Sequence, residues 1–156
     1  MSEFVIETDP TPEQIQHLED RLYEFNSQTT GITDGEGLAI FVRDEQGRVV
    51  AGIGGHTWGG CCEIKQFWVE EPRRRQGLGA KLLQAVEHEA RRRNCKKITL
   101  TTHSFQAPEF YVRHGFSVLA VVEDNPRGYQ NLLLQKELET VERVTNGPSA
   151  APSSAP

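Results

Sequence analysis

The chain has 156 residues, enough for one domain with a hydrophobic core and too few for two of ordinary size. Hydrophobic residues make up 37% and charged residues 25% of it, which is typical of a soluble folded protein and excludes disorder for most of the chain. The formal net charge of -5 argues against a general nucleic-acid binder, because the field of the whole molecule would repel a phosphate backbone.

No segment has the composition of a membrane span or a secretory leader. The longest nearly continuous apolar stretch, residues 116–122, has the length of a strand, and the first residues lack a basic run followed by an apolar one. Two of the three cysteines, Cys61 and Cys62, are neighbours, so a disulfide scaffold is excluded, and no zinc or calcium motif is present. We therefore expect a cytoplasmic protein with no metal site and no membrane partner.

The N-terminal segment predicts a short strand, a helix and a loop. Residues 4–6 are apolar and indicate an opening strand, and Thr11 followed by Pro12 is typical of a helix start. Residues 26–37 are polar and glycine-containing, so they predict a loop. Between them, apolar residues recur at helical spacing and predict one buried helix face. These residues are Ile15, Leu18, Leu22 and Phe25.

Three antiparallel strands and a longer helix are predicted next. Residues 38–43 and 49–57 flank the turn-forming residues 44–47, and residues 61–69 supply the third strand. From Gln76 the apolar spacing becomes that of an amphipathic helix.

Shorter elements complete the predicted fold. They are a strand around residues 98–100, a helix at 108–114, and strands at 116–122 and 131–135. This order indicates a mixed α/β fold, with helices packed on the faces of a mixed sheet, in a domain of residues 1–138. The low-complexity residues 139–156 indicate a disordered tail.

Residues 73–80, Arg-Arg-Arg-Gln-Gly-Leu-Gly-Ala, form the most informative motif. They place Gly77 and Gly79 in the first turn of a helix that follows a strand, where glycine costs about 1 kcal/mol relative to alanine. The free N–H groups of that turn, the helix dipole and the arginines together predict an anion site, most naturally for a pyrophosphate. A Walker loop is excluded because Ala80 follows Gly79, and a dinucleotide fingerprint is excluded because Leu82 stands where its third glycine belongs. A tight strand-to-helix turn with solvated arginines is the alternative.

Two motifs resemble the GNAT superfamily of N-acetyltransferases. Arg74-x-x-Gly77-x-Gly79, after the strand of residues 62–69, is similar to the acetyl-CoA site of that family. Residues 107–116 resemble the family's short helix, which carries a tyrosine, here Tyr111, before Gly-Phe. The resemblance covers roughly residues 4–138. It implies a central mixed β-sheet, mostly antiparallel and flanked by helices, in an enzyme that uses acetyl-CoA as co-substrate.

The resemblance also implies roles for individual residues. Arg74 and the amides of residues 75–80 would hold the pyrophosphate, and the end of the preceding strand would pair with the pantetheine amides. Ser104 stands where many members have an asparagine that bonds the pantetheine arm. Tyr111 would protonate the leaving thiolate, and Glu63 stands where some members have a general base. The residues assigned to the cofactor are Phe67, Trp68, Val69, Arg74, Arg75, Gln76, Gly77, Leu78, Gly79, Ala80 and Ser104.

Several functional alternatives follow from the same residues. Direct attack of an amine on the thioester is the expected reaction, because no histidine has a spacing that joins it to Cys61 or Cys62 as a nucleophile. The expected acceptor is a primary amine on a small molecule, ahead of a protein lysine or N-terminus. A non-catalytic acyl-CoA sensor, and a nucleic-acid-binding module that uses residues 73–75 and 91–93, are the alternatives from other classes. No motif specifies the acceptor or the oligomeric state, and a homodimer is left open.

Overall fold

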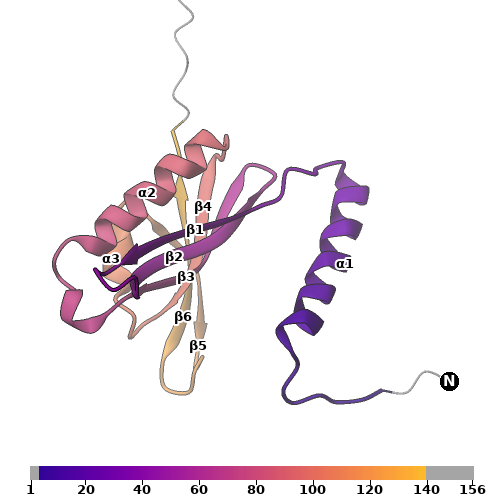
Figure 1. Cartoon of the computed structure of the whole chain (residues 1–156), viewed down its shortest axis with the longest axis horizontal. Helices are drawn as coiled ribbons and strands as arrows, with labels where there is room; N and C mark the ends of the chain where they lie inside the picture. The colour runs from indigo at the N-terminus through magenta and orange to yellow at the C-terminus, as the bar shows by residue number, and fades with distance from the viewer. Residues whose placement is uncertain (1–3, 140–156) are drawn as a thin grey trace, which may run out of the picture.

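The computed structural model describes residues 4–139 of the chain. It contains one six-stranded sheet with the strand order β1-β2-β3-β4-β6-β5 (Figure 1). Parallel pairing joins β3 to β4, and all other neighbouring strands in the described sheet are antiparallel. The predicted mixed, mostly antiparallel sheet is therefore confirmed. The strands are β1 (Glu36–Arg43), β2 (Val49–Trp58), β3 (Cys61–Val69), β4 (Lys97–His103), β5 (Ser117–Glu123) and β6 (Gln130–Glu137).

Helix α2 (Leu78–Arg92) packs along one face of this sheet and forms the core with it. Its buried apolar residues, which include Leu82, Leu83 and Val86, lie against strand residues such as Ile53 and Ile98. The apolar spacing predicted this helix correctly, because the buried residues recur every three or four positions. Two shorter helical segments complete the described fold. They are the helix α3 (Pro108–Arg113) and the single turn η1 (Glu71–Arg73).

Helix α1 (Pro12–Thr30) begins where the sequence predicts. The Thr11 hydroxyl accepts a hydrogen bond from the Gln14 N–H at 3.3 Å, and the Gln14 side chain accepts one from the Thr11 N–H at 2.7 Å. The helix ends at Gly31, which has a left-handed φ of 73°. Residues 26–30 are therefore helical, and the predicted loop begins only at Gly31.

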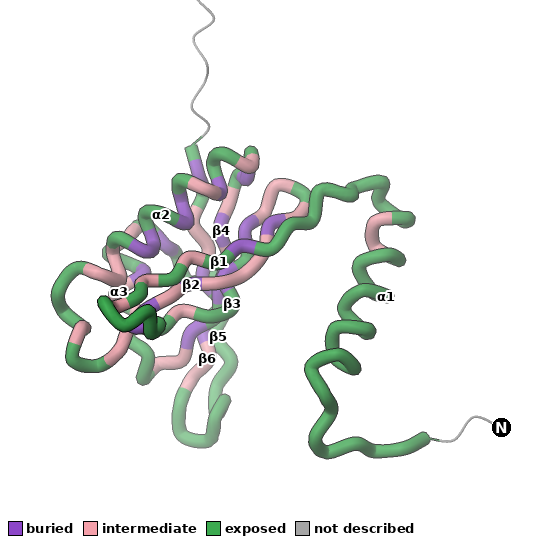
Figure 2. The backbone as a smooth tube through the Cα atoms, in the orientation of Figure 1, coloured by how far each residue is buried: buried purple, intermediate pink, exposed green. Residues whose placement is uncertain are grey.

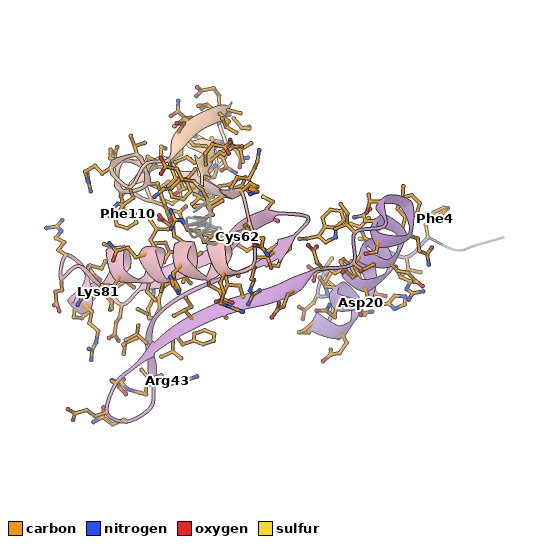
Figure 3. The ribbon with its side chains drawn as sticks, turned by 90° about the horizontal axis from the view of Figure 1, so that it is seen from above. Phe4, Asp20, Arg43, Cys62, Lys81 and Phe110 are labelled. Atoms are coloured by element: carbon orange, nitrogen blue, oxygen red, sulfur yellow. The ribbon has the colours of Figure 1, made fainter. Side chains whose placement is uncertain are left out.

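The prediction of a buried face on α1 is wrong. No residue of α1 is buried, and Figure 2 shows the helix as a nearly continuous exposed segment. The reason is its position: α1 stands beside the sheet, at the opposite end of β1 from Arg43, whereas Lys81 of α2 lies over the strands (Figure 3).

The prediction of an opening strand at residues 4–6 is also wrong. Phe4, Val5 and Ile6 are exposed and belong to no strand. They precede α1 and lie away from the sheet (Figure 1), so these apolar residues have no partner strand to complete a ladder.

The remaining elements agree with their predictions to within a few residues. No described helix has the length and apolar character needed to cross a membrane. Residues 140–156, which include nearly all of the predicted tail, lie outside the described residues.

Candidate active site

Strands β3 and β4 run side by side for four residues and then separate. Residues 61–64 pair with residues 97–100, and the pairing stops there although both strands continue. A bulge accompanies the separation, because Ile64 opposes Gly55 while Gln66 opposes Gly54, which leaves Lys65 as the extra residue. Gly55 is required at this point, since a Cβ there would collide with the Glu63 carbonyl oxygen. The space between the separated strands is a cleft lined by residues of both.

The unpaired part of β3 directs two amides into this cleft. The Glu70 N–H donates to the Val50 carbonyl of β2 at 2.9 Å. This bond shows which N–H groups at this end of β3 point towards β2. Because alternate residues of a strand bond to opposite neighbours, the N–H groups of Phe67 and Val69 point away from β2 and towards the gap. An extended ligand in the gap would meet these donors as an added strand does.

The N-terminus of α2 lies at the mouth of the same cleft. In the part of the chain that the structure describes, the N–H groups of Leu78, Gly79 and Ala80 have no hydrogen-bond partner, and no side chain caps them. Arg74 and Arg75 line the same opening. Free amides, the positive end of a helix dipole and guanidinium groups together make a site for an anion such as a pyrophosphate.

The two glycines of this turn have different physical explanations. Gly77 has a φ of 78°, in the left-handed region, so the backbone conformation favours glycine there. A Cβ on Gly79 would make only ordinary contacts, at 3.5 Å from Phe110 and 3.6 Å from Phe67. Packing within the chain does not require Gly79, which leaves close approach of a ligand as its explanation.

Tyr111 borders the inner part of the cleft from α3. Its side chain is buried, and its ring packs edge-on against Phe67 and Phe116, with ring centroids 6.2 and 5.8 Å apart. Burial raises the pKa of Tyr111 to about 12, so the hydroxyl keeps its proton at neutral pH.

Most of the predicted cofactor residues line the cleft. They are Phe67, Trp68, Val69, Arg74, Arg75, Gly77, Gly79 and Ala80. The side chain of Gln76 instead donates to the Pro72 carbonyl at 3.0 Å, and Leu78 packs against the core.

Ser104 lies beside the cleft and its hydroxyl points elsewhere. The Ser104 Oγ accepts a hydrogen bond from the Gln130 N–H at 3.1 Å. Gln106, which sequence reasoning missed, lines the cleft, and its Oε1 accepts from the His103 N–H at 2.9 Å. Gln106 stands two residues after Ser104, and its carboxamide can both donate to and accept from the amides of a ligand. This residue type was the signal in the sequence that could have identified it.

Glu63 lies on the face of the sheet opposite α2, just before the bulge. Its carboxylate is 3.5 Å from the His56 Nε2 of β2, and both side chains are partly open to solvent. The next residue, Ile64, lines the cleft, whereas Glu63 and His56 are not among the residues of its wall.

The cysteines are poorly placed for covalent catalysis. Burial raises the pKa of Cys62 to about 12 and also raises that of Cys95, so both thiols stay protonated. Cys61 is half-buried, with its Sγ 3.8 Å from the Thr99 hydroxyl. Among the described residues, no group of three or more histidine, cysteine and acidic side chains is placed to hold a metal ion.

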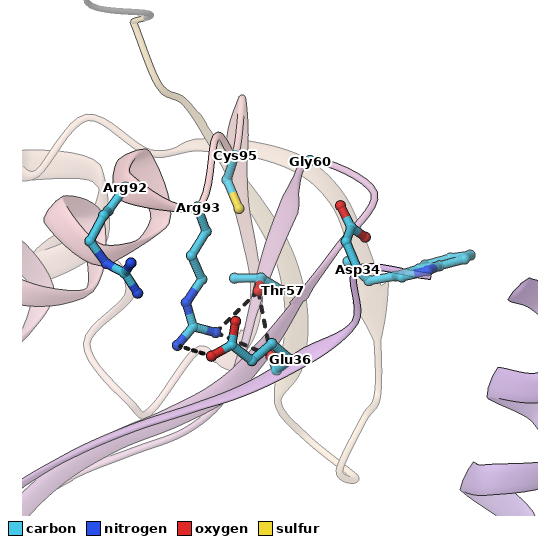
Figure 4. A pocket seen from close by; sticks show the side chains of 8 residues that line it. Asp34, Glu36, Thr57, Gly60, Arg92, Arg93 and Cys95 are labelled. Carbon is cyan, nitrogen blue, oxygen red and sulfur yellow. Dashed lines mark hydrogen bonds and ion pairs between the residues drawn. The ribbon is translucent and has the colours of Figure 1, made fainter. Parts of the chain in front are cut away.

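A second, smaller pocket lies at the other end of α2 and is built around a structural arginine (Figure 4). Arg93 donates to the Glu36 and Gly37 carbonyls at 3.3 and 3.0 Å and to the Thr57 hydroxyl at 3.2 Å. It also pairs with Glu89 at 2.7 Å. These bonds use the guanidinium to tie the end of α2 to β1 and β2.

The neighbouring cations are also paired with acids. Arg91 lies 3.6 Å from Glu87, and Arg92 lies 2.6 Å from Glu89. Each arginine of residues 91–93 therefore has a carboxylate within 4 Å, although Arg92 and Arg93 share Glu89.

Comparison with known proteins agrees with this geometry. The model of the acetyltransferase (GNAT) family matches residues 3–116. The chain belongs to the GNAT family. Acetyltransferase Atu2258 of Agrobacterium fabrum is 30% identical over 133 residues, which cover 85% of this chain and 97% of that protein. The protein is accordingly an acetyl-CoA-dependent acetyltransferase, as its motifs predict.

Two further relatives extend the comparison. Blasticidin-S acetyltransferase of Streptomyces morookaense is 35% identical over 104 residues, covering 66% of this chain and 76% of that protein. The crystal structure of an acetyltransferase from Bacillus cereus superimposes with a TM-score of 0.71 at 31% identity, covering 86% of this chain and 98% of that one. These GNAT relatives confirm the fold.

Gly79→Asp should weaken acetyl-CoA binding at least about tenfold, because it places bulk and a negative charge among the free amides of α2. The fold should persist, since a Cβ at this position meets only ordinary contacts. Isothermal calorimetry measures the affinity, and Gln84→Glu, an equal charge change at an exposed position of the same helix, is the control. Unchanged affinity in folded Gly79→Asp protein would rule out the anion site.

Proposed function

We propose that the protein transfers the acetyl group of acetyl-CoA to a primary amine on a small molecule, by direct attack of the amine on the thioester. The observation that carries this proposal is the continuity of one surface. The free amides of α2, the inward amides of Phe67 and Val69, and Tyr111 all border the cleft between β3 and β4. The α2 amides suit a pyrophosphate, the Phe67 and Val69 amides suit a pantetheine arm, and Tyr111 suits the thioester.

The chain's own groups can supply what acyl transfer needs. An N–H on the unpaired part of β3 can donate to the thioester carbonyl and stabilise negative charge that develops on its oxygen. Tyr111 holds a proton for the departing sulfur. A thiol has an ordinary pKa of about 8.5, below that of Tyr111, so this transfer leaves a tyrosinate, and the proton that the amine loses on acylation restores it.

The acceptor amine must lose a proton before it attacks. A primary ammonium has a pKa of about 10, so only a small fraction is neutral at physiological pH. Glu63 precedes the cleft-lining Ile64 in β3 and lies beside His56, and a carboxylate 3.5 Å from an imidazole can accept or relay that proton. We assign Glu63 the role of general base on this ground.

A cationic small molecule suits the surroundings of His56. Three acidic residues, Glu19, Asp20 and Glu36, line the space between α1 and the sheet, together with His56 and Lys65. Lys65 also lines the cleft, so the two spaces adjoin. The Streptomyces relative is named for acetylation of blasticidin S, which supports a small-molecule acceptor.

A screen of small amines with acetyl-CoA tests the proposal, with mass detection of acetylated products and thiol release as the readouts. Small polyamines and amine-bearing antibiotics should be acetylated, while lysine peptides should react poorly. Tight acetyl-CoA binding with no thiol release across the panel would favour the sensor, and preferential reaction with peptides would favour a protein acetyltransferase.

Direct transfer predicts that the enzyme forms no acetyl-cysteine. Intact-mass spectrometry after mixing with acetyl-CoA alone should show unmodified protein, because the Cys62 and Cys95 thiols stay protonated. Changing Cys61, Cys62 and Cys95 to Ala should leave most of the activity per folded molecule. A stoichiometric acetyl-cysteine that passes its acetyl group to an amine would contradict the direct-transfer mechanism.

Tyr111→Phe should lower kcat by about ten- to a thousandfold, the range for loss of a proton-transfer group. Acetyl-CoA affinity should change little, because the ring and its packing remain. Tyr129→Phe is the matched control, since Tyr129 is exposed and packs on Phe105 at the rim. Steady-state kinetics and calorimetry measure the two quantities, and an unchanged kcat in Tyr111→Phe would exclude the tyrosine as the acid.

Glu63→Gln should reduce activity at neutral pH and recover as the pH rises towards the pKa of the amine, because the substrate then supplies its own neutral form. Tyr111→Phe should show no such recovery, since the missing group is a proton donor whose pKa of about 12 keeps it protonated through this range. Full pH profiles of kcat/KM distinguish the two, with Glu45→Gln in the β1–β2 turn as the control. Wild-type activity of Glu63→Gln at neutral pH would remove Glu63 from the mechanism.

A further inference from the structure

We propose that the protein is a reciprocal homodimer, in which the apolar side of α1 docks on the uncovered face of the sheet in a second copy of the chain. Two exposed apolar surfaces on the described chain lead to this proposal. One lies on α1, and the other lies on β1 to β3.

The first surface is a stripe along α1. Ile15, Leu18, Leu22 and Phe25 are 43%, 64%, 61% and 64% exposed. Their spacing places them on one side of the helix. An amphipathic helix owes most of its stability to burial of such a stripe, and no described part of the chain covers this one.

The side of α1 that faces its own sheet is a different one. The Gly35 N–H donates to the Tyr23 hydroxyl at 3.0 Å, and the Tyr23 ring packs on Trp58 with a centroid distance of 6.5 Å. At 3.6 residues per turn, Tyr23 lies about 120° around the helix from the centre of the stripe. Apart from Leu22, the residues of α1 that line the space beside the sheet are Gln16, Glu19, Asp20, Tyr23 and Asn26. The chain's own sheet therefore meets a mainly polar side of α1.

The second surface is the face of the sheet opposite α2. Phe41 and Trp68, 57% and 49% exposed, lie in one cross-strand row with Gly52 between them, and Trp68 also borders the cleft. The neighbours of Phe41, Ile40 and Val42, pack against the core, so the alternation of the strand directs Phe41 to the opposite face. No described helix lies over this row.

A second copy satisfies both surfaces at once. Each chain offers one helix stripe and one sheet row, so a two-fold arrangement covers all four. At roughly 100 Å² of exposed surface for each of six large side chains per copy, the contact covers on the order of 1,200 Å², the lower end of stable specific interfaces.

A membrane surface fits the stripe less well. Helix α1 carries Glu13, Glu19, Asp20 and Glu24 against one basic residue, Arg21. Interfacial helices bind anionic lipid through lysine and arginine, so this charge would be repelled.

Sedimentation equilibrium of the full chain at micromolar concentration should give the mass of two chains. Leu18→Glu combined with Phe25→Glu should give the mass of one, because two charges would be buried in the contact. His17→Glu combined with Gln28→Glu changes exposed positions on the other side of the same helix and should remain dimeric. Phe41→Asp should also give one chain, which tests the sheet side separately.

The stripe variants should keep their fold, since α1 contributes nothing to the core, and circular dichroism checks this. A monomeric wild type, or a dimer that survives both stripe charges, would overturn the proposal. Binding of a monomeric wild type to vesicles containing phosphatidylserine would overturn it too, by assigning the stripe to lipid. If Phe41→Asp does not fold, the wild-type mass and the helix variants decide.

Discussion

Backbone N–H groups that lose their strand partner must bond to something else, and this requirement organises the whole site. Strands β3 and β4 are neighbours in one sheet, yet their pairing stops at Ile64 and Leu100. The bulge at Lys65 turns the rest of β3 away, and Gly55 makes room for it. The donors left in the gap are open to an extended, amide-bearing molecule, which would take the place of the missing strand.

The core fixes the position of helix α2 relative to this gap. Leu83 and Val86 hold α2 against the sheet, and Arg93 ties the C-terminal end of the helix to β1 and β2. Because these contacts fix α2 on the sheet, its N-terminal turn is held at the mouth of the cleft, where its free amides face the opening beside Arg74. One packing arrangement therefore positions both the free amides of α2 and the unpaired amides of β3, and Tyr111 lines the same cleft.

Features that depend on a few neighbouring residues could be predicted from the sequence. Glycines in a helix first turn and the proline that starts the helix carrying Tyr111 are encoded within a few residues, so α2 with its uncapped first turn and the short helix α3 could be predicted. The exposure of the α1 stripe could not, because helical spacing shows that Leu18 and Leu22 share a side without showing what covers it. The strand predicted at residues 4–6 was wrong for a similar reason, because apolar residues form a strand only where a neighbouring strand pairs with them. Gln106 was missed because its place in the cleft depends on how the loop after β4 folds.

Amide hydrogen exchange, followed residue by residue by NMR with and without acetyl-CoA, tests the central claim most directly. If the ligand replaces the missing strand and rests on the helix turn, exchange should slow at Phe67 and Val69 of β3 and at Leu78, Gly79 and Ala80 of α2. The amides of the β1–β2 turn should not change. Saturating acetyl-CoA that leaves these five amides exchanging at their original rates would contradict the site described above.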